Sequence, residues 1–92
     1  MIKTIRHKGL REYWKSGTAR RLNADWVPKI RRILNALDRA EAPEDMNIPG
    51  YYFHLLKGKE ANRYSVRVSG NWRITFEFDG NDATILDLED YH

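Results

Sequence analysis

Apolar residues near the start of the chain recur at the spacing of a helix. Leu10, Tyr13 and Trp14 fall at positions i, i+3 and i+4, and this spacing predicts a short helix. Gly17 follows at the position where a left-handed residue commonly ends a helix. Before this helix, residues 2–6 alternate apolar and polar side chains, which predicts a short strand.

A longer apolar stripe predicts a second helix and the centre of the hydrophobic core. Asn23 or Asp25 can cap this helix, and Pro28 is tolerated in its first turn. Two prolines and a glycine in residues 40–50 then mark a connection within one domain, where the chain changes from helices to a sheet. The residues of the stripe are Trp26, Val27, Ile30, Ile33, Leu34 and Leu37.

Alternation at period two predicts strands in the rest of the chain. Residues 51–56 can form a strand, and residues 64–68 and 72–78 form a hairpin with one buried face. Residues 83–90 are apolar on both sides, which predicts a central strand. We therefore expect an α+β fold, one compact domain over residues 1–92, with the N-terminal helices packed on a mainly antiparallel β-sheet.

Length and composition limit where a functional site can lie. The 92 residues make one domain with a modest core, so any active site must occupy a surface cleft. No apolar run approaches the roughly 18 to 20 residues of a membrane span, and the N-terminus lacks the apolar stretch of a signal peptide. Cysteine is absent, which excludes thiol nucleophiles and cysteine-based zinc sites. We therefore expect a cytoplasmic protein without membrane contact.

The charges are divided unevenly along the chain. Residues 1–39 carry eleven lysines and arginines and a net charge of +8, whereas residues 40–92 carry a net charge of −5. A basic half that contains aromatic side chains is typical of a nucleic-acid contact surface. A solvated basic face without a partner is the alternative. The candidate contacts in this half are Arg20, Arg21, Lys29, Arg31 and Arg32.

Strand alternation also sorts the polar side chains of the hairpin by face. Because its neighbours Trp72 and Ile74 are apolar and core-facing, Arg73 must emerge on the opposite face of the sheet. Arg67 of the adjacent strand shares that face. Two guanidinium groups on an open face favour an anionic ligand, and cross-strand pairing with Glu77 or another surface carboxylate is the alternative.

The last three residues and one internal histidine can carry further chemistry. Asp90, Tyr91 and His92 can move protons or bind phosphate, and alternation places Asp90 and His92 on one side of the last strand and Tyr91 on the other. His54 lies three residues before Lys57, and a half-buried structural role is the alternative for this histidine. His54, Asp90 and His92 are suitable metal ligands by type, but no close spacing supports a metal site. We expect no metal and no other cofactor.

Together these motifs resemble the HigB branch of the RelE/ParE toxin superfamily. The resemblance runs over the whole chain. Its specific part is the Asn-Trp-Arg-Ile-Thr-Phe block at residues 71–76 combined with the terminal Asp-Tyr-His. The His-Leu-Leu-Lys-Gly motif at residues 54–58 and Tyr-Ser-Val-Arg-Val at residues 64–68 add to it. Residues 40–50 correspond to a variable region of such toxins, which leaves an antitoxin contact there open.

The resemblance implies a type II toxin that inhibits translation as a ribosome-dependent mRNA endoribonuclease, or mRNA interferase. Such toxins cut messenger RNA in the ribosomal A site. They are neutralised by a HigA-like helix-turn-helix antitoxin, through which alone they reach operator DNA. The implied catalytic residues are His54, Asp90, Tyr91 and His92, and those that stabilise phosphate charge are Lys57 and Arg73. The candidate contacts with RNA or the ribosome come instead from the charge distribution and strand alternation, and they are Arg20, Arg21, Lys29, Arg31, Arg32 and Arg67.

The residue types at these positions suit RNA cleavage through the 2′-hydroxyl without a metal. This reaction needs a base for the hydroxyl proton, cations for the phosphate charge and an acid for the departing oxygen. His92 or Asp90 is our first expectation for the base and His54 the next, while Tyr91 can stack on or orient the substrate. Two other functions stay open: a non-catalytic binding module that acts as corepressor with its antitoxin, and a ParE-like inhibitor of DNA gyrase.

Overall fold

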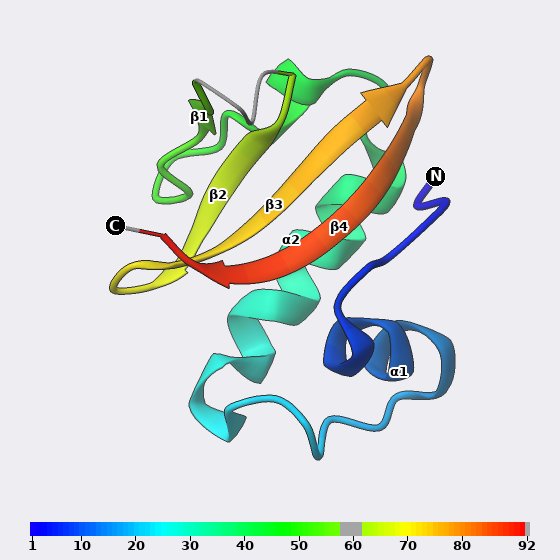
Figure 1. The fold of residues 1–92 in the computed structure, drawn as a ribbon, viewed down its shortest axis with the longest axis vertical. Helices are drawn as coiled ribbons and strands as arrows, with labels where there is room; N and C mark the ends of the chain where they lie inside the picture. Colours follow the sequence, from blue (N-terminus) through cyan, green and yellow to red (C-terminus); the bar gives the residue numbers. More distant parts are fainter. Residues whose placement is uncertain (58–61, 92) are drawn as a thin grey trace.

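The computed structural model describes residues 1–57 and 62–91, and in these ranges two helices pack on one face of a four-stranded sheet (Figure 1). The expected α+β fold, with N-terminal helices on an antiparallel sheet, is confirmed. The elements are α1 (Lys8–Ser16), the 3₁₀ turn η1 (Ala24–Trp26), α2 (Val27–Arg39), the 3₁₀ turn η2 (Pro43–Met46), β1 (His54–Leu55), β2 (Tyr64–Ser69), β3 (Trp72–Asp79) and β4 (Asp82–Asp90).

Helix α1 has partners for backbone groups at both of its ends. At its start, the N–H of Leu10 donates to Nδ1 of His7 at 3.2 Å. At its end, Gly17 adopts φ 79° and donates its N–H to the carbonyl of Tyr13 at 2.9 Å, as the sequence predicts. Within the described ranges, no helix is both long and apolar enough to span a membrane.

The predicted apolar stripe lies on α2 and fills the core. The helix begins at Val27, because Trp26 belongs to the preceding turn η1. Of the two predicted caps, Asn23 caps this turn, and its side chain accepts the N–H of Asp25 at 2.9 Å. Burying each large apolar side chain contributes about 1.5–3 kcal/mol to folding. The fully buried residues of α2 and the sheet include Ile30, Ile33, Leu34, Leu37, Val66, Ile74, Phe76 and Leu86.

The strands follow one another in the order β1-β2-β3-β4, and each neighbouring pair is antiparallel. The predicted central position of the last strand is therefore wrong, because β4 ends the order. Its double-sided apolar pattern comes from a break in register between Thr75 and Glu77 of β3, opposite which Ile85 of β4 adopts φ 51°. Such a bulge shifts the alternation by one residue, so that Ala83 and Leu88, an odd and an even position, are both buried.

The N-terminal segment covers the outer edge of β4 (Figure 1). It runs parallel to β4 but makes only isolated bridges, from Ile2 to Ala83 and from Ile5 to Leu86, so the predicted strand over residues 2–6 does not form. The bulge explains this difference, because the N–H of Ile85 bonds the side-chain oxygen of Thr4 at 2.8 Å instead of a backbone carbonyl.

Strand β1 is shorter than the predicted strand over residues 51–56. Gly50 and Tyr52 have φ values of 87° and 50°, in the left-handed region that is incompatible with a strand. Pairing with β2 therefore starts only at His54. Before His54, the carbonyl of Tyr51 accepts the N–H of Arg67 in β2 at 2.7 Å, but no regular ladder forms there.

A buried arginine holds the strands together on the face that the helices leave open. The side chain of Arg63 is only 5% exposed and pairs with Glu77 at 3.0 Å and with Glu89 at 4.0 Å. It also donates to Oγ1 of the buried Thr75 at 2.7 Å and to the carbonyl of Ile85 at 3.0 Å. Thr75 in turn donates to Glu89 at 2.5 Å. This network joins β3 and β4 to the residue that precedes β2.

Replacing Arg63 by methionine should destabilise the fold. We expect the free energy of unfolding to fall by about 3 kcal/mol, the lower end of the range for removing one partner of a buried ion pair, because the two glutamates can regain water. Urea denaturation measures the change. The control Lys3→Met removes an exposed partner of Asp82 and should cost less than about 1 kcal/mol. Equal losses in both variants would contradict a structural role for the network.

Candidate active site

The strand register brings basic residues from three strands onto the open face of the sheet. His54 pairs with Ser65, and Arg67 pairs directly with Arg73. Directly paired residues of antiparallel strands point to the same side. The predicted sharing of one face by Arg67 and Arg73 is therefore confirmed.

The opposite face is the one that the helices cover. There the ring of Trp72 packs against Trp26, with 5.3 Å between the ring centroids. This contact fixes which side of β3 faces the core. The guanidinium of Arg73 consequently leaves β3 on the side away from α2.

A single backbone oxygen holds His54 and Arg73 together. The carbonyl of Tyr52 accepts Nη1 of Arg73 at 3.1 Å and lies 3.0 Å from Nδ1 of His54. The same Nη1 donates to the hydroxyl of Ser65 at 3.2 Å. His54 itself is exposed, so it does not have the half-buried structural role that was its alternative.

The contact with Tyr52 determines which nitrogen of His54 can take a proton. A carbonyl can only accept a hydrogen bond, so Nδ1 of His54 must carry the hydrogen. In the neutral ring Nε2 then keeps its lone pair. His54 therefore presents a proton acceptor beside the guanidinium of Arg73.

Two further cations are fixed on the adjacent residues of the same segment. Nζ of Lys29 donates to the carbonyl of Gly50 at 3.2 Å and lies 5.0 Å from the ring centroid of Tyr51. The N–H of Arg67 donates to the carbonyl of Tyr51 at 2.7 Å, and its guanidinium lies 5.2 Å from the ring centroid of Tyr52. Lys29 on α2 is thus close to the open face of the sheet.

The electrostatics of Lys29 reflect this position. Burial, followed by the positive charges of Arg32 and Arg67, lowers the pKa of Lys29 below its usual value. Cations that repel one another in this way favour a ligand of opposite charge. Lys29, Arg67 and Arg73 therefore form a basic cluster along residues 50–52, and we call it the cationic track.

The end of β4 lies beside this region but presents its residues on two sides. Asp90 pairs with Trp72, which places it on the face that the helices cover, while Glu89 pairs with Arg73. The next residue, Tyr91, donates its backbone N–H to the carbonyl of Asn71 at 2.8 Å. His92 lies outside the described residues. The chain end is thus held to the β2–β3 hairpin at Tyr91.

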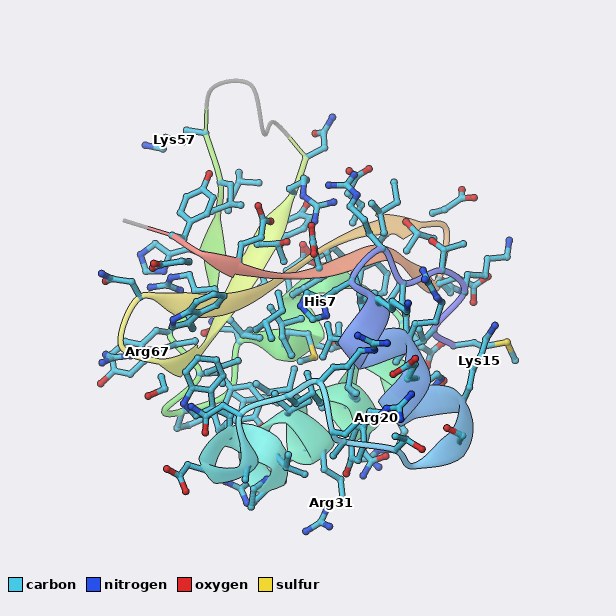
Figure 2. The ribbon with its side chains drawn as sticks, turned by 60° about the horizontal axis from the view of Figure 1, so that its bottom comes forward. His7, Lys15, Arg20, Arg31, Lys57 and Arg67 are labelled. Carbon is cyan, nitrogen blue, oxygen red and sulfur yellow. The ribbon has the colours of Figure 1, made fainter. Side chains whose placement is uncertain are left out.

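The other predicted basic residues do not form one surface. Figure 2 shows Lys57 and Arg67 on the side of the molecule where β4 ends, whereas Arg20 and Arg31 lie on the side of the helices. Arg20, Arg31 and Arg32 are exposed. Arg21 instead pairs with Glu12 at 3.0 Å. Of the predicted RNA contacts, Lys29 and Arg67 belong to the cationic track, and Arg32 is close enough to Lys29 to repel its charge.

A metal ion has few candidate ligands in the part of the chain that the structure describes. There, no three histidine or acidic side chains are grouped closely enough to bind one. A surface hollow of about 540 Å³ lies elsewhere, between the N-terminal segment and α1. It is lined by residues 2–5 with Arg11, Trp14 and Lys15, and by none of the predicted catalytic residues that the structure describes.

Sequence reasoning missed Tyr52 and Ser65. Ser65 could have been found, because alternation along β2 places it on the face of Arg67. Tyr52 could not have been found. Its carbonyl contacts His54 and Arg73 in a left-handed backbone conformation that non-glycine residues seldom adopt.

Comparison with known proteins places the chain in a family. Residues 3–92 match the family model of HigB-like toxins, described as RelE-like toxins of the type II toxin–antitoxin system HigB. The chain belongs to this family. A curated relative, Endoribonuclease HigB of Proteus vulgaris, is 41% identical over the full length of both chains.

The fold of the family agrees with a solved structure. A chain of the YoeB–YefM complex from Staphylococcus aureus superposes with a TM-score of 0.65 over 100% of this chain and 98% of that chain, at 20% identity. The protein is thus a RelE-like toxin of a type II toxin–antitoxin system, and an antitoxin is its partner.

Substituting Arg67 by glutamine should raise the pKa of Lys29. The protonated form of Lys29 then loses one repelling charge, so the proton is retained to higher pH. NMR titration of the lysine Nζ or Cε resonances measures the change. Arg31→Gln, an exposed position on the same helix, should leave the pKa of Lys29 in place. An unchanged or lower pKa in Arg67→Gln would show that the two side chains do not interact.

Proposed function

We propose that this protein is a ribosome-dependent mRNA endoribonuclease that inhibits translation in the cytoplasm by cutting messenger RNA in the ribosomal A site. Full-length similarity to a curated endoribonuclease supports the activity. The assignment of catalytic roles to named residues rests on the carbonyl of Tyr52, which contacts both His54 and Arg73. This carbonyl holds an exposed imidazole and a guanidinium side by side on an open sheet face.

His54 is the general base of this proposal. Nε2 of its neutral ring can take the proton of the 2′-hydroxyl, because the contact of Nδ1 with Tyr52 fixes both the tautomer and the orientation of the ring. The attacking oxygen then displaces the 5′-oxygen at the phosphate, which leaves a 2′,3′-cyclic phosphate. This assignment reverses the order expected from the sequence, in which His92 or Asp90 came first.

Arg73 stabilises the negative charge that develops on the phosphate. Its guanidinium has five donors, and Nη1 is the atom that contacts Tyr52 and Ser65. These contacts fix the plane of the guanidinium, so the remaining donors are oriented in advance for phosphate oxygens. Lys57, exposed on the same side of the molecule, supplies a second cation (Figure 2).

The chain end supplies the acid for the departing 5′-oxygen. Tyr91 is the first candidate, since Asp90 pairs with a residue on the helix side of the sheet and alternation turns Tyr91 the other way. His92, which lies outside the described residues, is a candidate by residue type. The hydrogen bond from the N–H of Tyr91 to Asn71 supports this placement, because it holds the chain end to the hairpin that carries Arg73.

The partners follow from the family and the charge distribution. We propose a HigA-like helix-turn-helix antitoxin, which would also connect the toxin to operator DNA, and the ribosome with its bound messenger. The exposed Arg20 and Arg31 on the side of the helices, together with Arg32 of α2, would contact ribosomal RNA phosphates. The cationic track would contact the messenger.

Expression of the chain without an antitoxin should arrest growth and produce cuts inside translated codons, mapped by primer extension. With purified ribosomes, His54→Ala should lose about 10² to 10⁴ in rate, the usual contribution of a general base. Arg73→Ala should lose about 10² to 10³ through the unneutralised phosphate charge. Lys15→Ala, an exposed position away from the site, is the control and should cut normally.

The same purified variants separate the proposal from its rivals. Intact messenger in cells that express the wild-type protein at a high level would rule out nuclease activity. Normal cutting by His54→Ala would move the base to His92 or Asp90. A wild-type protein that blocks gyrase supercoiling but spares messenger would be a ParE-like inhibitor.

Charge reversal of Arg20, Arg31 and Arg32 should weaken ribosome binding and flatten its salt dependence. Each lost phosphate contact should reduce the slope of log K against log salt by about one. The thermal unfolding midpoint serves as the control for folding and should change little, because all three side chains are exposed. If ribosome affinity stays the same, these residues form a solvated face without a partner.

A further inference from the structure

Tyr52 combines two features that are unusual for a tyrosine. It is 57% exposed, and its φ of 50° lies in the left-handed region that bulky residues rarely occupy. A tyrosine that serves packing is normally shielded, as are the neighbouring Tyr51 and Tyr64, which are half-buried. Strained and exposed residues of this kind cluster at ligand-binding sites.

Its surroundings hold Tyr52 in this conformation from two directions. The backbone carbonyl is fixed by Arg73 and His54, the two groups proposed to act on the scissile phosphate. One face of the ring is covered by the guanidinium of Arg67, 5.2 Å from the ring centroid. Because the residue is 57% exposed, the part of the ring that Arg67 does not cover is accessible to a ligand.

The chemistry around the ring suits a nucleotide. An exposed aromatic ring can stack on any base, because every base has a π-face, and cations beside it attract the phosphates that flank the base. Arg67 lies over the ring, and Lys29 lies over the adjacent ring of Tyr51. Leu55 is similarly exposed, at 54%, but pairs across the sheet with Tyr64 and belongs to the other face.

We propose that the accessible part of the Tyr52 ring is a stacking platform for the base of a nucleotide next to the scissile phosphate, and that Arg67 and Lys29 bind the flanking phosphate. The inference rests on the proposed function, because it takes RNA as the substrate. It adds a binding subsite whose position is set by the same carbonyl that positions the catalytic pair.

The test separates the ring from the backbone conformation. Tyr52→Phe keeps the ring, whereas Tyr52→Asn removes it but retains a residue that tolerates the left-handed region. In single-turnover cleavage of ribosome-bound messenger, Tyr52→Asn should lose about ten- to a hundred-fold in kcat/KM, the usual effect of removing one base–aromatic stack. Tyr52→Phe should stay near the wild-type value, and Leu55→Ala is the matched control for an exposed apolar side chain.

An abasic messenger identifies the contact. Two messengers are compared with the intact one, and each lacks the base on one side of the cut. The wild type should cut one of these two messengers more slowly than the intact messenger. On that messenger, Tyr52→Asn should cause no further loss, because the two changes remove the same interaction. Circular dichroism and antitoxin binding check that the variants fold.

The outcomes distinguish this inference from the proposed function. A wild-type protein that cuts no ribosome-bound messenger overturns the proposed function and the inference with it. A cutting wild type with an equally active Tyr52→Asn overturns the inference alone. So does an equal loss in Tyr52→Phe and Tyr52→Asn, or a loss in Tyr52→Asn that persists on both abasic messengers. Weakened antitoxin binding with normal cleavage would make Tyr52 part of a protein interface instead.

Discussion

Three consecutive backbone carbonyls, in residues 50–52, hold the basic side of this protein in place. They accept hydrogen bonds from Lys29, from the backbone of Arg67, and from Arg73 together with His54. Carbonyl groups carry a dipole but no net charge. They can therefore fix the position of cations without cancelling their charge, which a carboxylate would do. The cations keep their full attraction for a phosphate. Burial, followed by the positive charges of Arg32 and Arg67, lowers the pKa of Lys29.

The open face of the sheet is consequently divided into two regions of different charge. Around Arg63, the carboxylates of Glu77 and Glu89 neutralise a buried guanidinium and tie β3 and β4 together. Towards β1 and β2, Arg67 and Arg73 are held by carbonyl oxygens, a hydroxyl and an aromatic ring. The first region stabilises the sheet, and the second is available to an anionic ligand. Strand register decides which arginine belongs to which region.

Much of the fold and part of the site could be predicted from the sequence, because both depend on side-chain periodicity. The α2 stripe and the shared face of Arg67 and Arg73 follow directly from helical and strand spacing. The edge position of β4 did not follow, since a bulge at Ile85 imitates the pattern of a central strand. The contacts of the Tyr52 carbonyl with His54 and Arg73 could not be predicted either, because periodicity does not show which single residue adopts a left-handed conformation.

The attachment of the N-terminal segment to β4 affects when the protein can fold during its own synthesis. The N–H of Ile85 bonds the side chain of Thr4 across a separation of 81 residues, so the N-terminal segment can bind its partner only after β4 has been made. Contacts of such long range close late and slow the folding of a domain. While β4 is still inside the ribosomal exit tunnel, β3 lacks one of its two partner strands and the buried network of Arg63 is incomplete. The sheet and the basic side chains that it positions can therefore be assembled only after β4 has been synthesised.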